Sequence, residues 1–107
     1  MENSFEDIIE SIKKIEEYTT GLSYEDFEEN NLVTDAVVRN IEIIGEASKN
    51  IPDDIRYLFK DIPWQKLRGI RNRIVHDYFD VDRSIIWHIV TNELSSLKNI
   101  LQNHLKN

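Results

Sequence analysis

The sequence predicts an all-α fold: an up-down four-helix bundle with a short extra helix before its third long helix. Apolar residues recur at helical spacing along most of the 107 residues, and no segment alternates apolar and polar residues as a strand does. Only three glycines and two prolines interrupt these patterns. The length fits a single domain that covers residues 1–107.

The first two long helices are predicted over residues 4–20 and from about Val33 to Asn50. The apolar stripe of the first consists of Phe5, Ile8, Ile9, Ile12, Ile15 and Thr19. Between the helices, Ser23 and Asp26 form a capping pattern that opens a short acidic turn. The second stripe consists of Val33, Ala36, Val37, Ile41, Ile44, Ala47 and Ile51. Gly45 costs this helix about 1 kcal/mol relative to alanine, which indicates a close helix crossing.

Two prolines divide the third element, because proline is tolerated in the first turn of a helix. Pro52 precedes a short piece, residues 53–60, and Pro63 precedes a longer piece that begins at Trp64 and ends near Tyr78. The apolar side of the short piece consists of Ile55, Leu58 and Phe59.

Asp82 is placed to cap a last helix whose apolar residues cover about 200° of the helical wheel. They are Ile85, Ile86, Ile89, Val90, Leu94, Leu97, Ile100, Leu101 and Leu105. A helix that packs against a single core needs a narrower apolar stripe than this. The stripe therefore favours a homodimer in which the last helix also faces a second subunit, and deep burial within one small bundle is the alternative.

Composition excludes several classes of function. The chain has no cysteine, and His76, His88 and His104 share no metal-ligand spacing, so we expect no metal and no other cofactor. No apolar run exceeds four residues, which is too short to cross a bilayer. The acidic start lacks the features of a signal peptide, so the expected location is the cytoplasm, without a membrane partner.

The net charge of -7 is unevenly distributed. Residues 1–55 contain 15 acids and 4 bases, residues 56–83 contain 4 acids and 7 bases, and residues 84–107 contain 1 acid and 2 bases. The basic middle segment can meet an anionic ligand locally, whereas the acidic first half suits a protein partner equally well.

The densest polar cluster, residues 68–78, contains the parts of a metal-free ribonuclease. His76 can transfer protons, Arg71 can stabilise phosphate charge, and Asn72 can orient either group. On a helix, Arg71 and His76 lie about 140° and about 7.5 Å apart, so they do not converge within one chain. Arg71 of one subunit can approach His76 of the other near a two-fold axis, and the spacing therefore favours a composite site in a dimer.

Each of these residues also has a structural explanation. His76 lies near a helix end, where a cation is favoured, and Tyr78 can be a core residue with a hydrated hydroxyl. Arg71 and Arg73 can simply pair with Glu42 or Glu46. Glu46 either faces the cluster or is an ordinary exposed glutamate. Arg68 and Glu46 are accordingly candidate supporting residues.

The segment Arg71–Tyr78 resembles the Arg-x4-His-x-Tyr motif of the HepT-like toxins in the HEPN superfamily. Residues 35–47 are similar to the second-helix signature of that family, and Trp64 with Leu67 and Arg68 resembles the approach to its motif. Residues 81–97 resemble the family's final helix. The resemblance covers nearly the whole chain.

The resemblance implies a HEPN-like dimer that acts as a metal-independent endoribonuclease toxin, with RNA as its substrate. It also implies an MntA-like nucleotidyltransferase antitoxin that transfers AMP to the motif tyrosine. By this resemblance Arg71 and His76 are catalytic, Asn72 supports their geometry, and Tyr78 is the modified residue. The alternative is a non-catalytic helical module that docks the nucleotidyltransferase or its substrate, and the intact Arg71 and His76 favour the enzyme.

Overall fold

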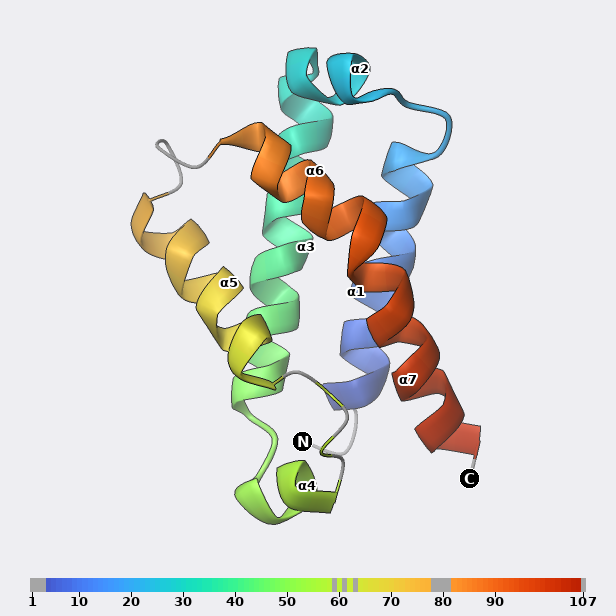
Figure 1. Cartoon of the computed structure of the whole chain (residues 1–107), viewed down its shortest axis with the longest axis vertical. Coiled ribbons are helices and arrows are strands. Elements are labelled where there is room, and N and C mark those ends of the chain that lie inside the picture. The colour runs from blue at the N-terminus through green and yellow to red at the C-terminus, as the bar shows by residue number, and fades with distance from the viewer. Residues whose placement is uncertain (1–3, 59, 61, 63, 78–81, 107) are drawn as a thin grey trace.

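The computed structural model describes residues 4–58, 60, 62, 64–77 and 82–106. Within these ranges the chain forms helices and no strand, which confirms the all-α class. The helices are α1 (Ser4–Thr19), α2 (Tyr24–Glu29), α3 (Asn31–Lys49), α4 (Asp53–Leu58), α5 (Trp64–Asp77), α6 (Arg83–Asn92) and α7 (Leu94–Lys106). The long segments α1, α3, α5 and α6–α7 alternate in direction, as an up-down bundle requires (Figure 1). No described helix has both the length and the apolar character needed to cross a bilayer.

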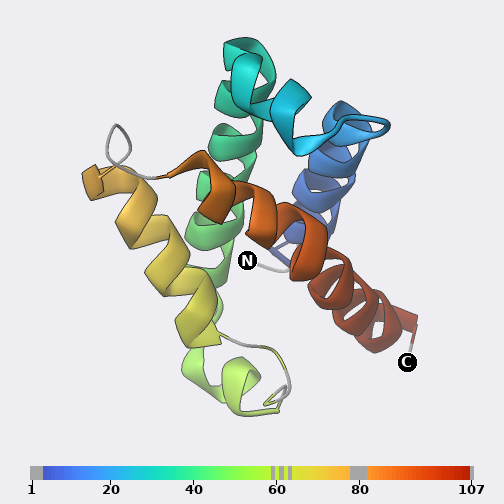
Figure 2. The same ribbon diagram turned by 45° about the horizontal axis from the view of Figure 1, so that its top comes forward.

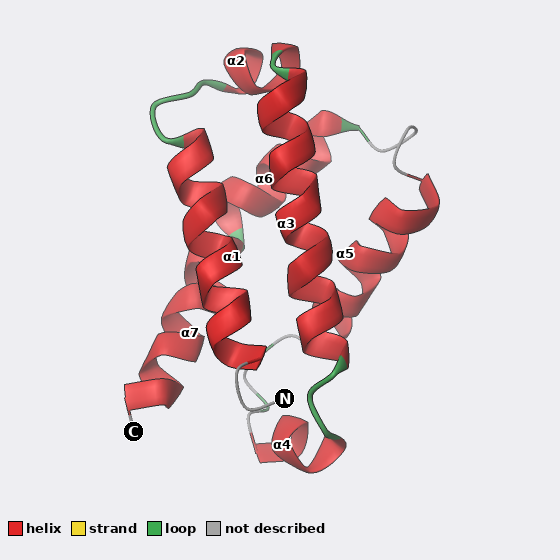
Figure 3. Cartoon of the chain, turned by 180° about the vertical axis from the view of Figure 1, so that it is seen from behind, coloured by secondary structure: helices red, strands yellow, loops and turns green. Residues whose placement is uncertain are grey.

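The antiparallel pair α1 and α3 forms the centre of the bundle, and Figure 3 shows the two helices side by side. The predicted stripes face each other across this contact. Ile8, Ile12 and Ile15 of α1 and Val37 of α3 are completely buried. The remaining long segments pack around this pair, with α5 against α3 and α7 against α1.

The segment that was expected to be a short acidic turn is the helix α2, which packs against α3 and α6 (Figure 2). The predicted capping pattern is confirmed, because Ser23 Oγ accepts a hydrogen bond from the Asp26 amide and the Asp26 carboxylate accepts one from the Ser23 amide. Sequence analysis missed Phe27, which is completely buried with its ring centroid 5.0 Å from that of Trp87.

The prediction of one continuous last helix is wrong, because the chain forms α6 and α7 with a break at Glu93. Asp82 caps α6 as predicted, and the hydrogen bond from the Ser84 amide lowers the pKa of its carboxyl. Just before the break, the Thr91 hydroxyl donates to the Trp87 carbonyl at 2.9 Å, a type of contact that often bends helices. The bend lets α6 pack on α2 while α7 packs on α1.

This bend also accounts for the wide apolar stripe within one chain. Six of its residues are buried in the core: Ile86, Ile89, Val90, Leu94, Leu97 and Leu101. Ile85 and Ile100 pack against that core, and Leu105 remains exposed. Burial within one chain therefore explains the width of the stripe. The width of the stripe no longer supports a dimer.

The short helix α4 ends at Leu58, not at Lys60 as predicted. Ile55 packs against the core as expected, whereas Leu58 is 70% exposed, so its assignment to a buried side was wrong. The helix has only six residues and lies at the edge of the bundle, where one turn contacts the core. Phe59 lies outside the described residues.

Candidate active site

The close crossing that Gly45 predicted is confirmed, and its partner is Arg71 of the motif helix α5. A Cβ atom added at Gly45 would overlap Arg71 Cβ and Cγ and would lie 3.4 Å from Arg71 Cα. Glycine therefore lets α5 approach α3 at the residue proposed to bind phosphate. The helix propensity lost at Gly45 has a structural reason in this contact.

Arg71 is held at the crossing by polar contacts on both helices. Its guanidinium pairs with Glu46 of α3, and its Nη1 donates to Asn72 Oδ1 at 3.3 Å. The side chains of Arg71 and Glu46 are 26% and 48% exposed, so the pair lies at the surface and solvent screens it. Arg71 Nε is buried and has no hydrogen-bond partner in the described part of the chain.

These contacts decide two of the alternatives that the sequence left open. Glu46 does face the basic cluster, and its partner is Arg71. The structural explanation of Arg71 as a member of an ion pair with α3 is thus correct for the free chain, with Glu46 as the partner. A phosphate that binds Arg71 must compete with this carboxylate.

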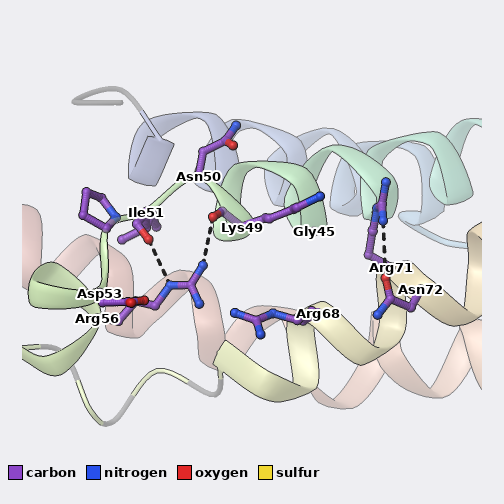
Figure 4. Close-up of a pocket in the computed structure, with 10 residues that line it drawn as sticks. Gly45, Lys49, Asn50, Ile51, Asp53, Arg56, Arg68, Arg71 and Asn72 are labelled. Carbon is purple, nitrogen blue, oxygen red and sulfur yellow. Dashed lines mark hydrogen bonds between the residues drawn. The ribbon is translucent and has the colours of Figure 1, made fainter.

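Arg71 borders two depressions in the surface. One, of about 640 Å³, lies between the end of α3, the start of α4 and the start of α5 (Figure 4). Its lining residues are Gly45, Lys49, Asn50, Ile51, Pro52, Asp53, Arg56, Arg68, Arg71 and Asn72. The other, of about 330 Å³, contains more acids and is lined by Asp7, Arg39, Glu42, Ile43, Glu46, Ala47, Asn50 and Arg71.

The structure brings most of the predicted supporting residues together. Arg68, Arg71 and Asn72 line the larger depression, which we call the basic groove, and Glu46 reaches Arg71 from α3. His76 belongs to α5, but its side chain is outside the described part, and Tyr78 lies outside the described residues altogether.

Arg56 of the basic groove belongs to the basic segment, residues 56–83, that the sequence indicated, whereas Lys49 lies outside that segment and was missed. Lys49 is the last residue of α3, and Arg56 follows seven positions later. A basic residue in the last turn of a helix is a weak signal, because its ordinary function is to complement the helix dipole. Lys49 lies near Arg71 and Asn72 only because α5 packs beside the end of α3 in the folded chain.

Comparison with known proteins identifies the family. A family model described as ribonuclease HepT-like matches residues 8–104. The protein named "Probable ribonuclease HepT" from Thermococcus cleftensis is 45% identical over 93 residues, which are 87% of this chain and 84% of that protein. "Putative RNase MJ1380" from Methanocaldococcus jannaschii is 39% identical over 92 residues, 86% of this chain and 84% of its own.

A relative from a third organism agrees with these two. The protein named "Putative RNase TTE0752" from Caldanaerobacter subterraneus is 39% identical over 101 residues, which are 91% of this chain and 90% of that protein. No solved structure is significantly similar to the chain. The match to the family model spans α1 to α7 and includes the whole Arg71–Tyr78 motif. The chain belongs to the HepT-like ribonuclease family.

Proposed function

We propose that the chain is a metal-independent endoribonuclease and the toxin of a toxin-antitoxin pair, with Arg71 and His76 as catalytic residues. The observation that carries the proposal is the fixed position of Arg71 at the α3–α5 crossing, where its guanidinium borders a groove lined by further cations. The names of the relatives, which describe ribonucleases, support RNA as the substrate.

In this mechanism RNA supplies its own nucleophile. The 2′-hydroxyl loses its proton to a base and attacks the adjacent phosphorus, and the bond to the 5′-oxygen breaks as that oxygen receives a proton. His76 is the general acid or base, because a histidine near neutral pKa can take part in either transfer. Arg71 stabilises the charge that develops on the phosphoryl oxygens, and Asn72 orients its guanidinium.

The active species is a homodimer in this proposal. The angular offset of about 140° between Arg71 and His76 on the continuous helix α5 separates them within one chain. Two α5 helices that cross near a two-fold axis bring Arg71 of one subunit toward His76 of the other. The dimer thus supplies the geometry that one helix lacks.

The purified, unmodified chain is expected to cleave total RNA in the presence of a chelator and to leave DNA intact. The products should end in a cyclic phosphate, in which the 2′-oxygen stays bonded to phosphorus, or in the 3′-phosphate that forms when water opens this ring. Gel analysis and end-labelling of the fragments measure both results. Loss of cleavage in chelator, or equal cleavage by the His76→Ala chain, would contradict the mechanism.

An MntA-like nucleotidyltransferase antitoxin controls the toxin by transferring AMP from ATP to the hydroxyl of Tyr78, with pyrophosphate as the leaving group. Seven residues separate Tyr78 from Arg71, which is about 20° on the wheel if the helix continues, so AMP would project over the face of the phosphate-binding arginine. Intact-mass measurement after co-expression should show added AMP on wild type and none on Tyr78→Phe, which should stay toxic. AMP on Tyr18, Tyr24 or Tyr57 would overturn this assignment.

The resting ion pair favours one alternative function. Because Glu46 already neutralises Arg71 in the free chain, Arg71 can be a structural residue of a non-catalytic module that docks the nucleotidyltransferase or its substrate. The RNA assay above separates the two functions, since the docking module binds its partner and cleaves no RNA.

A further inference from the structure

The basic groove contains two cations that the proposed catalysis does not use as reacting groups. Lys49 comes from α3 and Arg68 from α5, so they stand on opposite walls of the groove (Figure 4). Both residues are exposed, and neither forms an ion pair with a described side chain. Asp53 is the only acid that lines the groove in the described part of the chain.

The third additional cation, Arg56, has a structural function. Its Nε donates to the Ile51 carbonyl at 3.0 Å, and its Nη2 donates to the carbonyls of Ser48 and Lys49 at 2.9 Å each. The Ser48 and Lys49 carbonyls belong to the last turn of α3, where the helix dipole places partial negative charge. Arg56 therefore offsets the negative charge at the end of α3, which would otherwise repel a phosphate in the groove.

Arg68 lies one helical turn before Arg71 on the same helix. Residues at this spacing are neighbours on a helix surface, with Cβ atoms about 5–6 Å apart. This spacing is close to the step between successive phosphates of an extended nucleic acid strand. A strand whose phosphate lies at Arg71 can therefore place the next phosphate at Arg68, opposite Lys49.

We propose that the basic groove binds the RNA phosphate next to the one that is cleaved, with Lys49 and Arg68 as its ligands. This subsite rests on the proposed ribonuclease function and defines how the strand lies on the protein. A positively charged groove that follows the backbone binds single strands without reading their sequence. Lys49 and Arg68 thus contribute affinity and register, whereas Arg71 and His76 act on the reacting phosphate.

The experiment measures binding of wild-type protein to a short 2′-O-methyl oligoribonucleotide, which cannot be cleaved because its 2′-oxygens are blocked. Fluorescence anisotropy at several salt concentrations gives Kd and its salt dependence. The Lys49→Gln/Arg68→Gln variant is expected to bind several-fold more weakly, with a slope of log K against log salt reduced by about 0.7 for one lost phosphate contact. The matched control is Lys13→Gln/Lys14→Gln, which removes the same charge from exposed positions of α1, a helix that contributes no residue to the lining of the groove.

A second arm locates the phosphate. Each oligonucleotide carries one neutral methylphosphonate, which is placed at a different position in each. At one position this replacement should weaken binding to the wild-type protein, and at the same position it should not change binding to the Lys49→Gln/Arg68→Gln variant. Unchanged affinity and slope in that variant, with normal RNA cleavage by wild type, overturn the subsite and leave the proposed function intact. Failure of wild type to bind and to cleave RNA overturns both. If the variant loses binding of free AMP while RNA binding is unchanged, the groove is a mononucleotide site and the proposal is wrong.

Discussion

A mixed dimer of one Arg71→Ala chain and one His76→Ala chain is expected to regain about half of the wild-type ribonuclease activity. Each substitution in both subunits should slow cleavage by about 10²- to 10⁴-fold, because it removes either charge stabilisation or proton transfer. In the mixed dimer, one of the two composite sites combines the intact Arg71 of one subunit with the intact His76 of the other. Differently tagged chains, co-expressed and purified on both tags, provide the mixed species.

The matched control reverses the arrangement of the same substitutions. A dimer of one wild-type chain and one chain with both Arg71→Ala and His76→Ala has no intact composite site, so it should be inactive. A site formed within one chain would produce the opposite pattern: half activity in the control dimer and none in the mixed dimer. The pair of measurements thus separates the two geometries even if each variant loses some stability, since both dimers carry the same two substitutions.

The helical stripes were predictable because their period depends only on neighbours along the chain. Ile8, Ile12 and Ile15 follow the 3.6-residue repeat and are all buried. The break at Glu93 was not predictable from this pattern, because the apolar repeat continues across it. The bend has a local contact beside it, and tertiary packing then separates the two pieces, because α6 contacts α2 and α7 contacts α1.

The candidate site was predictable to a similar extent. The unfavourable helix propensity of Gly45 indicated a close helix crossing. The sequence contains no local signal that the partner in this crossing is Arg71. Likewise, a glutamate near a glycine does not reveal whether it pairs with an arginine 25 positions later. The contact of Lys49 with the same groove depends on the path through α4, which returns the chain past the end of α3.

Gly45→Ala is expected to destabilise the fold, whereas Gly69→Ala should stabilise it. Alanine improves helix propensity by about 1 kcal/mol at either site. At Gly69 the described residues place no atom within 4 Å of the added Cβ, apart from the chain neighbours and the backbone of the same helix, so this gain is retained. At Gly45 the Cβ overlaps Arg71, and overpacking costs about 1–3 kcal/mol. Thermal denaturation should show Tm changes of opposite sign, with about 4–8 °C for each kcal/mol in a domain of this size.

The same substitution tests whether the crossing positions the catalytic arginine. Relief of the overlap moves α5 away from α3, which shifts Arg71 from its position beside the basic groove, so Gly45→Ala should also reduce RNA cleavage at temperatures where the chain remains folded. Gly69→Ala should not. In an Arg71→Gly background, which lacks both overlapping atoms, Gly45→Ala should no longer lower the Tm, because only the propensity gain remains. If Gly45→Ala destabilises both backgrounds equally, the close approach to Arg71 is not the reason for glycine at this position.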